Sequence, residues 1–267
     1  MNDKHVKYLV IVSAIFLLLS GVILYAVFDK QGMKNRKDNT YINYNVNDYV
    51  EVIPVVFNDY INVYSSINVS KINFKNIDTG LTDSFIKKQD EIIGYITGYY
   101  NEINANANYI PVNSVYSSIK TQINGAILSI YYQVNFNLDE AIFEDNIKSY
   151  IITLNIDLGT NKILINDDLL SKYSYTKNYI ADKLFNEDVL TEKGQVVIDK
   201  NTNISLTESD IIRKKEEYVD RIISEFNNII DMYIENNNLV LIYDTKEIKN
   251  VFFDNKFDTN IKFRYLK

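Results

Sequence analysis

The sequence has no cysteine, no tryptophan and a single histidine, His5, and these absences exclude several kinds of chemistry. Without cysteine the chain has no disulfide, no thiolate metal site and no residue that could carry a lipoprotein anchor. Because His5 precedes the main body of the chain, Ser-His triads, histidine acid–base catalysis and His-ligated zinc are excluded from that body. The eight glycines form no phosphate-binding loop.

The residue inventory therefore predicts a protein that is not an enzyme, with no catalytic, cofactor-binding or metal-binding residues and no cofactor. A pair of carboxylates for glycoside cleavage stays open, because the 35 acidic residues could supply one and sequence does not give the spacing between side chains. A net charge of −7 argues against a nucleic-acid partner. The carboxylates between residues 137 and 147 lack the spacing of a calcium loop, and we interpret them as a solvated connection.

A long apolar run, YLVIVSAIFLLLSGVILYAVF, occupies residues 8–28 and contains no charged residue. As a helix it would be roughly 31 Å long, close to the thickness of a bilayer's hydrocarbon core. The run continues to Asp29 without a small-x-small cleavage site, which favours a retained membrane anchor over the alternative of a cleaved signal peptide. We therefore expect residues 8–28 to contact membrane lipid.

This anchor divides the chain into parts that would lie on different sides of a plasma membrane. We predict a short cytoplasmic tail over 1–7, the anchor over 8–28, a tether over 29–47 and an extracytoplasmic domain over 48–267, with a subdivision near 107–120 as an alternative. More Lys and Arg follow the anchor than precede it, which favours the opposite orientation. A large domain after so short a tail is commonly translocated, and we expect it outside.

Hydrophobic periodicity predicts an α+β domain with antiparallel strands. Residues 125–136 and 148–158 alternate with period two, and the two strands should pair antiparallel. The alternation places Ile152, Leu154 and Ile156 inward and Thr153, Asn155 and Asp157 outward. We also expect one or two strands within 48–69, with Pro54 at an edge or bulge, and a hairpin over 231–244 followed by a last strand.

Two long amphipathic helices are predicted to cover these strands, over 81–103 and 207–230. The first would be capped by Thr82 or Asp83, and the second begins with a capping box formed by Thr207 and Asp210. Short helices are expected at 166–170 and 175–185. The intervening turn contains Gly159 and Asn161, and both can take positive φ.

The segment DLGTNKILINDDLL, residues 157–170, resembles a motif of the extracytoplasmic domain shared by lysozyme-sensing anti-sigma factors and the non-catalytic N-terminal region of a peptidoglycan deacetylase. The matching residues are Asp157, Leu158, Thr160, Lys162, Asp168 and Leu169. Asn161 stands for the motif's turn glycine and Leu170 for its Phe. Residues 235–248, ENNNLVLIYDTKEI, resemble the family's late hairpin, with Lys246 where Tyr is expected.

This resemblance implies a fold and an extracytoplasmic location rather than an activity. The family's Gly-Gly-Ala-His segment has no counterpart in residues 137–147, and we expect neither an anti-sigma nor a deacetylase domain. The leading hypothesis is a membrane-anchored, non-enzymatic binding or sensing module for a wall-associated protein or a glycan derived from peptidoglycan. The alternatives are an assembly protein that recruits membrane partners through the anchor or helix 207–230, and a carboxylate-based glycan hydrolase.

Overall fold

The structure is a computed structural model that describes residues 44–56, 65–105, 113–137, 149–190, 196–255 and 257–266. The predicted tail, the anchor at 8–28, most of the tether and the acidic connection within 138–148 lie outside these residues. Among the described residues no helix is both long enough and apolar enough to cross a bilayer. The described residues belong to one compact unit that begins at Tyr44, and its fold is α+β, as predicted.

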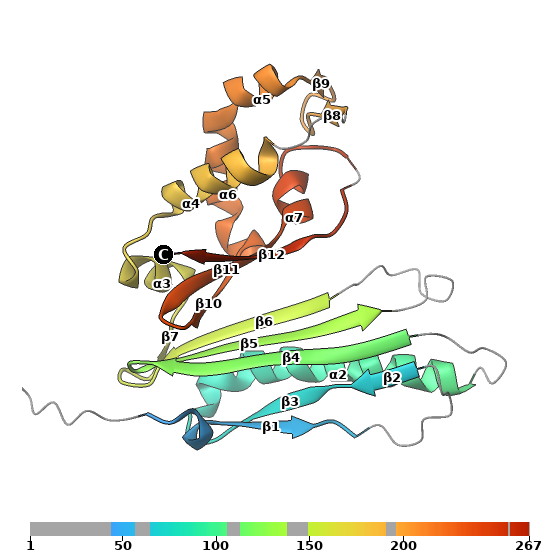
Figure 1. The fold of residues 1–267 in the computed structure, drawn as a ribbon, viewed down its shortest axis with the longest axis vertical. Helices are drawn as coiled ribbons and strands as arrows, with labels where there is room; N and C mark the ends of the chain where they lie inside the picture. Colours follow the sequence, from blue (N-terminus) through green and yellow to red (C-terminus); the bar gives the residue numbers. More distant parts are fainter. Residues whose placement is uncertain are drawn as a thin grey trace, which may run out of the picture. The chain divides into compact units, whose positions relative to one another are not determined.

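The larger sheet has five strands in the order β2-β4-β5-β6-β7 (Figure 1). Their bounds are Ser65–Asn68, Asn113–Asn124, Ile127–Asn137, Ser149–Asp157 and Lys162–Ile163. The predicted antiparallel pair is confirmed as β5 and β6, which are in register from Ile127 opposite Asp157 to Asn135 opposite Ser149. The sheet is mixed rather than purely antiparallel, because β2 pairs parallel with β4.

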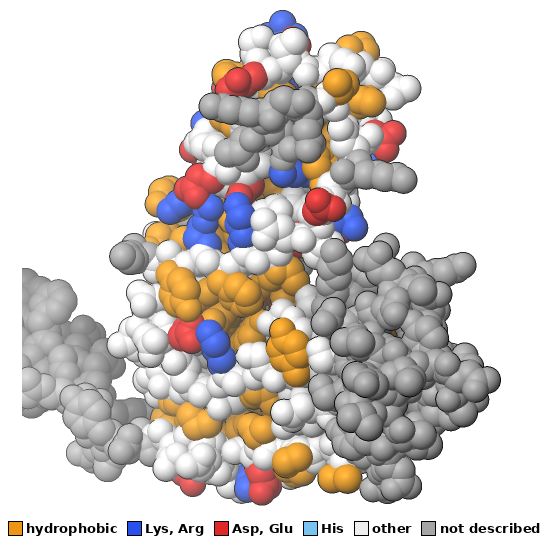
Figure 2. Space-filling model, turned by 45° about the vertical axis from the view of Figure 1, so that its right-hand side comes forward, with side chains coloured by type: hydrophobic (Ala, Val, Ile, Leu, Met, Phe, Trp, Pro, Cys, Tyr) orange, Lys and Arg blue, Asp and Glu red, His pale blue; other side chains and the backbone are white. Residues whose placement is uncertain are grey.

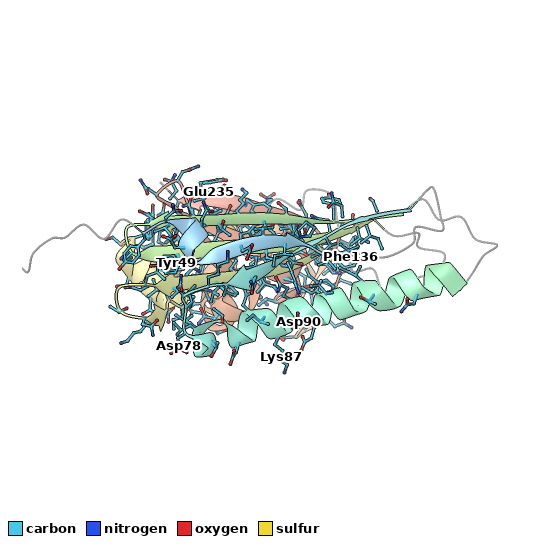
Figure 3. All side chains as sticks on the ribbon, turned by 90° about the horizontal axis from the view of Figure 1, so that it is seen from below. Tyr49, Asp78, Lys87, Asp90, Phe136 and Glu235 are labelled. Atoms are coloured by element: carbon cyan, nitrogen blue, oxygen red, sulfur yellow. The ribbon has the colours of Figure 1, made fainter. Side chains whose placement is uncertain are left out.

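Helix α2, Thr79–Ala105, covers one face of this sheet. Its buried side chains Phe85, Ile92 and Ile96 share a core with inward residues of β5 and β6. Figure 3 shows α2 along the strands with Lys87 pointing away from them, and Glu235 on the other side of the sheet. The predicted start of this helix at Thr82 or Asp83 is wrong. The chain enters the helix earlier, because the Asp78 carboxylate accepts a hydrogen bond from the backbone N–H of Gly80.

A small two-stranded sheet is formed by two strands that lie before and after β2 in the sequence. It consists of β1, Val50–Pro54, and β3, Ser70–Phe74, and it follows a short 3₁₀ helix over Val46–Asp48. Among the described strands β1 pairs with β3 alone, so Pro54 lies on an edge strand, where its missing N–H costs no ladder bond. The sequence pattern did not predict the strand at 70–74.

The C-terminal part of the unit is built on a second antiparallel sheet, in the order β10-β11-β12. These strands span Asp231–Glu235, Asn238–Asp244 and Ile261–Leu266, which confirms the predicted hairpin and last strand. A minor hairpin joins β8, Val197–Ile198, to β9, Ser205–Leu206. The surrounding helices are α3 Asn166–Lys172, α4 Lys177–Leu184, the π-helical turn Phe185–Val189, α5 Glu208–Arg213, α6 Lys215–Ile229 and α7 Thr245–Asn250.

The second predicted long helix is divided into α5 and α6 by a break at Lys214, which has φ −90° and ψ 10°. Its predicted capping box is confirmed, because Asp210 N–H donates to the Thr207 hydroxyl and Thr207 N–H donates to the Asp210 carboxylate. The apolar stripe of α6, which contains Tyr218 and Phe226, is fully buried in the C-terminal core. Each long helix thus covers a different sheet.

Part of the larger sheet's second face, the one opposite α2, is covered rather than exposed to solvent. One prediction about this face is therefore wrong. Asn155, predicted to point outward, is only 4% exposed. Its amide donates to the carbonyl of Met232 in β10 and accepts from the Ser129 hydroxyl, which in turn accepts from the N–H of Ile234. Polar side chains therefore join the two sheets where the period-two pattern indicated a solvated face.

The turn between β6 and β7 follows the predicted chemistry in part. Asn161 has φ 55°, as predicted, whereas Gly159 does not have positive φ. The Asp157 carboxylate accepts from the N–H groups of Gly159 and Thr160 and fixes the first half of the turn. The left-handed conformation is consequently needed two residues later, at Asn161, where asparagine tolerates it.

Candidate functional site: a groove along the outer edge of β6

Strand β6 has one paired edge and one edge that is largely open. Along its inner edge it pairs with β5 from Ser149 to Asp157. On the opposite edge β7 pairs only with Ile156 and Asp157, and among the described strands no other lies beside β6. An open strand edge presents unpaired backbone donors and acceptors to whatever lies beside it.

The direction of these backbone groups follows from one hydrogen bond at the end of the strand. The carbonyl of Asn155 accepts from the N–H of Leu164, so Asn155 turns its backbone groups away from β5. Because these directions alternate along an antiparallel strand, Ser149, Ile151 and Thr153 also turn their N–H and C=O groups outward. The outward groups of Ser149, Ile151 and Thr153 thus lie along roughly 17 Å of strand edge beside which no described strand lies.

Three hollows follow this edge. The acidic hollow, about 330 Å³ in volume, is lined by Ile151 and by residues of α6, β11 and α7. The helix hollow, about 320 Å³, lies between β6 and α2 and is also lined by Ile151. The turn hollow, about 310 Å³, reaches β7 and shares Asp231 with the acidic hollow. Because the hollows share lining residues, they adjoin one another, and we call the three together the β6 groove.

The acidic hollow contains three carboxylates, Asp231, Asp244 and Glu247, and no Lys or Arg is part of its described lining. One of the three already has protein partners, because the Asp244 carboxylate accepts hydrogen bonds from the backbone N–H groups of Lys246 and Asn260. Asp231 and Glu247 are therefore the acidic groups of this hollow that could meet a ligand. The nearest cation in the groove is Lys88, which lines the helix hollow.

Asp231 begins β10 and points into the groove beside β6. Its side chain reaches solvent, but it is surrounded by protein atoms, and this desolvation raises the pKa of the carboxyl above its usual value. The charge of Lys88 and a hydrogen bond with Thr153 oppose the increase without cancelling it. A carboxylate held in a concave site at an electrostatic cost is the arrangement expected of a group that awaits a cationic partner.

Ser149 supplies a further polar group to the groove. Its hydroxyl is buried at the start of β6, lines the acidic hollow and makes no hydrogen bond to any described residue. A buried polar group left unpaired costs on the order of 1–3 kcal/mol, so most are paired. The groove therefore combines open backbone groups, an unpaired hydroxyl and a desolvated carboxylate.

The buried carboxylates of the described residues, Asp188 and Asp199, are engaged within the fold. Asp199, which is wholly buried, accepts from the N–H groups of Asn201 and Thr202 and from Lys214, at 2.7 Å from its ammonium. Burial alone would raise the pKa of Asp199, but these donors outweigh it and hold the pKa well below its usual range. We interpret Asp199 as a structural residue that fixes the turn between β8 and β9 to Lys214.

Asp188 has a similar structural environment in the π-helical turn. It accepts from the Tyr243 hydroxyl at 2.9 Å and forms ion pairs with Lys262 and Arg264 of β12. Burial is the main cause that raises the pKa of Tyr243, and the adjacent Asp188 adds to it. Although π-helical turns are frequent at functional sites, the partners of Asp188 come from the fold itself.

The exposed aromatic residues form a separate surface. Figure 2 shows hydrophobic side chains gathered on one face around a neighbouring acidic and basic pair. Exposed aromatic side chains on β4 and β12 include Tyr116, Phe263 and Tyr265. Phe263 packs edge-on against buried Tyr131, and the Tyr265 hydroxyl bonds to Glu235. Protein contacts hold these two β12 aromatics, whereas the groove offers unpaired groups, so we place the candidate site in the groove.

The residues that carry the family resemblance have structural roles where the structure describes their contacts. Asp157 orders the β6–β7 turn, Asp168 accepts from the N–H of Ile165 at the start of α3, and Leu169 is fully buried. None of the six matching residues lines the acidic hollow, the helix hollow or the turn hollow. No site residue was predicted from the sequence, because nothing in it distinguishes Asp231 from the neighbouring acidic residues.

Among the described residues no group of three or more His, Asp or Glu side chains could hold a metal ion. Comparison with known proteins adds no further assignment: no protein-family model matches the chain, and no curated protein matches it significantly. The candidate site therefore depends on its own geometry.

Proposed function

We propose that this protein is a membrane-anchored, non-enzymatic binding or sensing module of a bacterial envelope, held by residues 8–28, whose extracytoplasmic domain binds a wall-associated ligand in the β6 groove. The observation that carries the proposal is the open run 149–153 within three adjoining hollows, beside a desolvated Asp231. The apolar character of residues 8–28 and the resemblance over 157–170 support the location.

The binding test uses the full chain, solubilised in detergent and immobilised, with lysozyme and muropeptides as probes. We expect at least one probe to be retained, and we expect the double variant Asp231→Asn, Glu247→Gln to lose retention. The matched control is Asp83→Asn, Asp90→Asn, which removes the same charge from exposed positions on α2. Loss of retention in both double variants, or no retention by the unaltered chain, would contradict the proposed site.

The proposed location has its own test. Protease treatment of intact cells is expected to digest the domain after residue 28 while leaving a cytoplasmic marker protein intact. A domain that is protected until the cells are lysed would place it on the cytoplasmic side and would remove wall ligands from consideration.

A second function, carboxylate-based cleavage of wall glycans, is favoured by one observation. Asp231 has a raised pKa, as a general acid requires, and shares the acidic hollow with Glu247. Release of reducing ends from purified peptidoglycan, abolished by Asp231→Asn, would establish this activity in place of simple binding. The assembly hypothesis has less support at helix 207–230, because the apolar face of α6 is packed inside the unit.

A further inference from the structure

Within the proposed binding function, and resting on it, we infer that the β6 groove takes an extended segment of a partner protein as an added strand, antiparallel to β6, with Lys or Arg at alternate positions. Such a strand would pair with the outward backbone groups of Ser149, Ile151 and Thr153. Its basic side chains would enter the acidic hollow. Strand addition of this kind derives affinity from main-chain hydrogen bonds and specificity from pockets for alternate side chains.

We choose the antiparallel direction because a strand that continues the line of β7, which lies along the same edge of β6, would be antiparallel. Strand β7 pairs antiparallel with Ile156 and Asp157, and then the chain leaves the edge after Leu164. A segment continuing this line beyond Leu164 would meet the outward backbone groups of Thr153, Ile151 and Ser149. About six residues in extended conformation are enough to cover that distance.

The two faces of β6 determine which side chains the added strand should carry. Ile151 lines the acidic hollow, and Thr153 lines the turn hollow, where it hydrogen-bonds to the shared residue Asp231. Tyr150 and Ile152 point toward α2 and line the helix hollow with Ile92. Residues directly opposite each other in an antiparallel pair place their side chains on the same face. The partner residues that pair with Ile151 and Thr153 should therefore be basic, and the residues between them apolar.

Charge complementarity favours a basic rather than an acidic segment as the added strand. The acidic hollow has Asp231 and Glu247 available and no described Lys or Arg in its lining. A Lys or Arg side chain there would supply the counter-charge that desolvated Asp231 otherwise has only from Lys88, and a donor for the unpaired Ser149 hydroxyl oxygen. An acidic segment would meet like charge at the same positions, which is unfavourable.

The experiment measures binding of a synthetic eight-residue peptide that alternates arginine and valine to the full chain in detergent, by fluorescence anisotropy. A peptide of the same composition with its arginines in one block controls for charge alone. We expect the alternating peptide to bind at least about tenfold more tightly than the block peptide. We expect Asp231→Asn, Glu247→Gln to weaken binding by about tenfold or more, and Asp83→Asn, Asp90→Asn to leave it unchanged.

Two N-methylated peptides test the backbone pairing without altering the protein. In the antiparallel arrangement the arginine N–H groups face β6, so methylation of the arginine nitrogens should abolish binding and methylation of the valine nitrogens should preserve it. Tight binding by the arginine-methylated peptide would overturn the inference. If no peptide binds but lysozyme or a muropeptide is still retained in an Asp231-dependent manner, strand addition is wrong and the binding module stands; if nothing is retained, both fail.

Discussion

The two ends of strand β6 differ in how many of their hydrogen-bonding groups are paired within the fold. At the closed end, Asn155 bonds to Ser129 and to Met232, and β7 covers the outer edge. At the open end, the backbone from 149 to 153 has no described strand beside it, and the Ser149 hydroxyl has no described partner. One strand thus contains both a fully bonded junction between two sheets and outward backbone groups, at Ser149, Ile151 and Thr153, beside which no described strand lies.

This difference places groups that stabilise the fold at one end of β6 and groups that could bind a ligand at the other. Polar groups that hold a fold together are paired inside it, and their loss is costly. Groups that await a ligand are left unpaired at some cost to the free protein, and their removal should be neutral or stabilising. Substitutions at the two ends of β6 should therefore have effects of opposite sign on stability.

The largest expected effect is at the closed end. Asn155→Ala removes a buried amide and leaves the Ser129 hydroxyl and the Met232 carbonyl without their partner. We expect the free energy of unfolding to fall by about 2–4 kcal/mol, measured by chemical denaturation. A loss below about 0.5 kcal/mol would show that the junction between the sheets does not depend on this network.

A smaller effect of opposite sign is expected at the open end. Ser149→Ala removes a buried hydroxyl that has no described partner. We expect the free energy of unfolding to rise by about 0.5–1 kcal/mol in the same denaturation experiment. A clear loss of stability would mean that this hydroxyl is bonded in the folded protein and would weaken the contrast between the two ends.

The smallest effect, and one that depends on pH, is expected at Asp231. Its raised pKa means that the folded state binds a proton more readily than the unfolded state, so stability falls as pH rises from the ordinary aspartate value of 3.8 through the folded-state pKa. Asp231→Asn should therefore raise the melting temperature at neutral pH, with the gain shrinking in acid. Equal melting temperatures for both proteins at all pH values would contradict the desolvation of this carboxylate.

The sequence predicted much of this fold because local patterns were strong. Period-two alternation located β5 and β6 and their pairing, and the Thr207–Asp210 spacing located the start of α5. The burial of Asn155 could not be predicted, because alternation shows that two faces differ without showing what covers the second one. The helix break at Lys214 likewise leaves the apolar periodicity on both sides intact.

The candidate site could not be predicted from the sequence for a different reason. An open strand edge depends on how short the next strand is, and β7 has only two residues. The acidic hollow brings together Ser149 and Glu247, which are distant in the chain, and its character depends on which cations lie near it. Neither property leaves a local pattern in composition or spacing.

Amide hydrogen exchange, resolved by residue, tests the open edge most directly. In the free protein we expect the amides of Ile151 and Thr153 to exchange at least about 100-fold faster than those of Ile152 and Leu154, which face β5. The alternating arginine–valine peptide should then slow exchange at Ile151 and Thr153. Slow exchange at all four amides in the free protein would show that this edge is already covered, and would contradict the account.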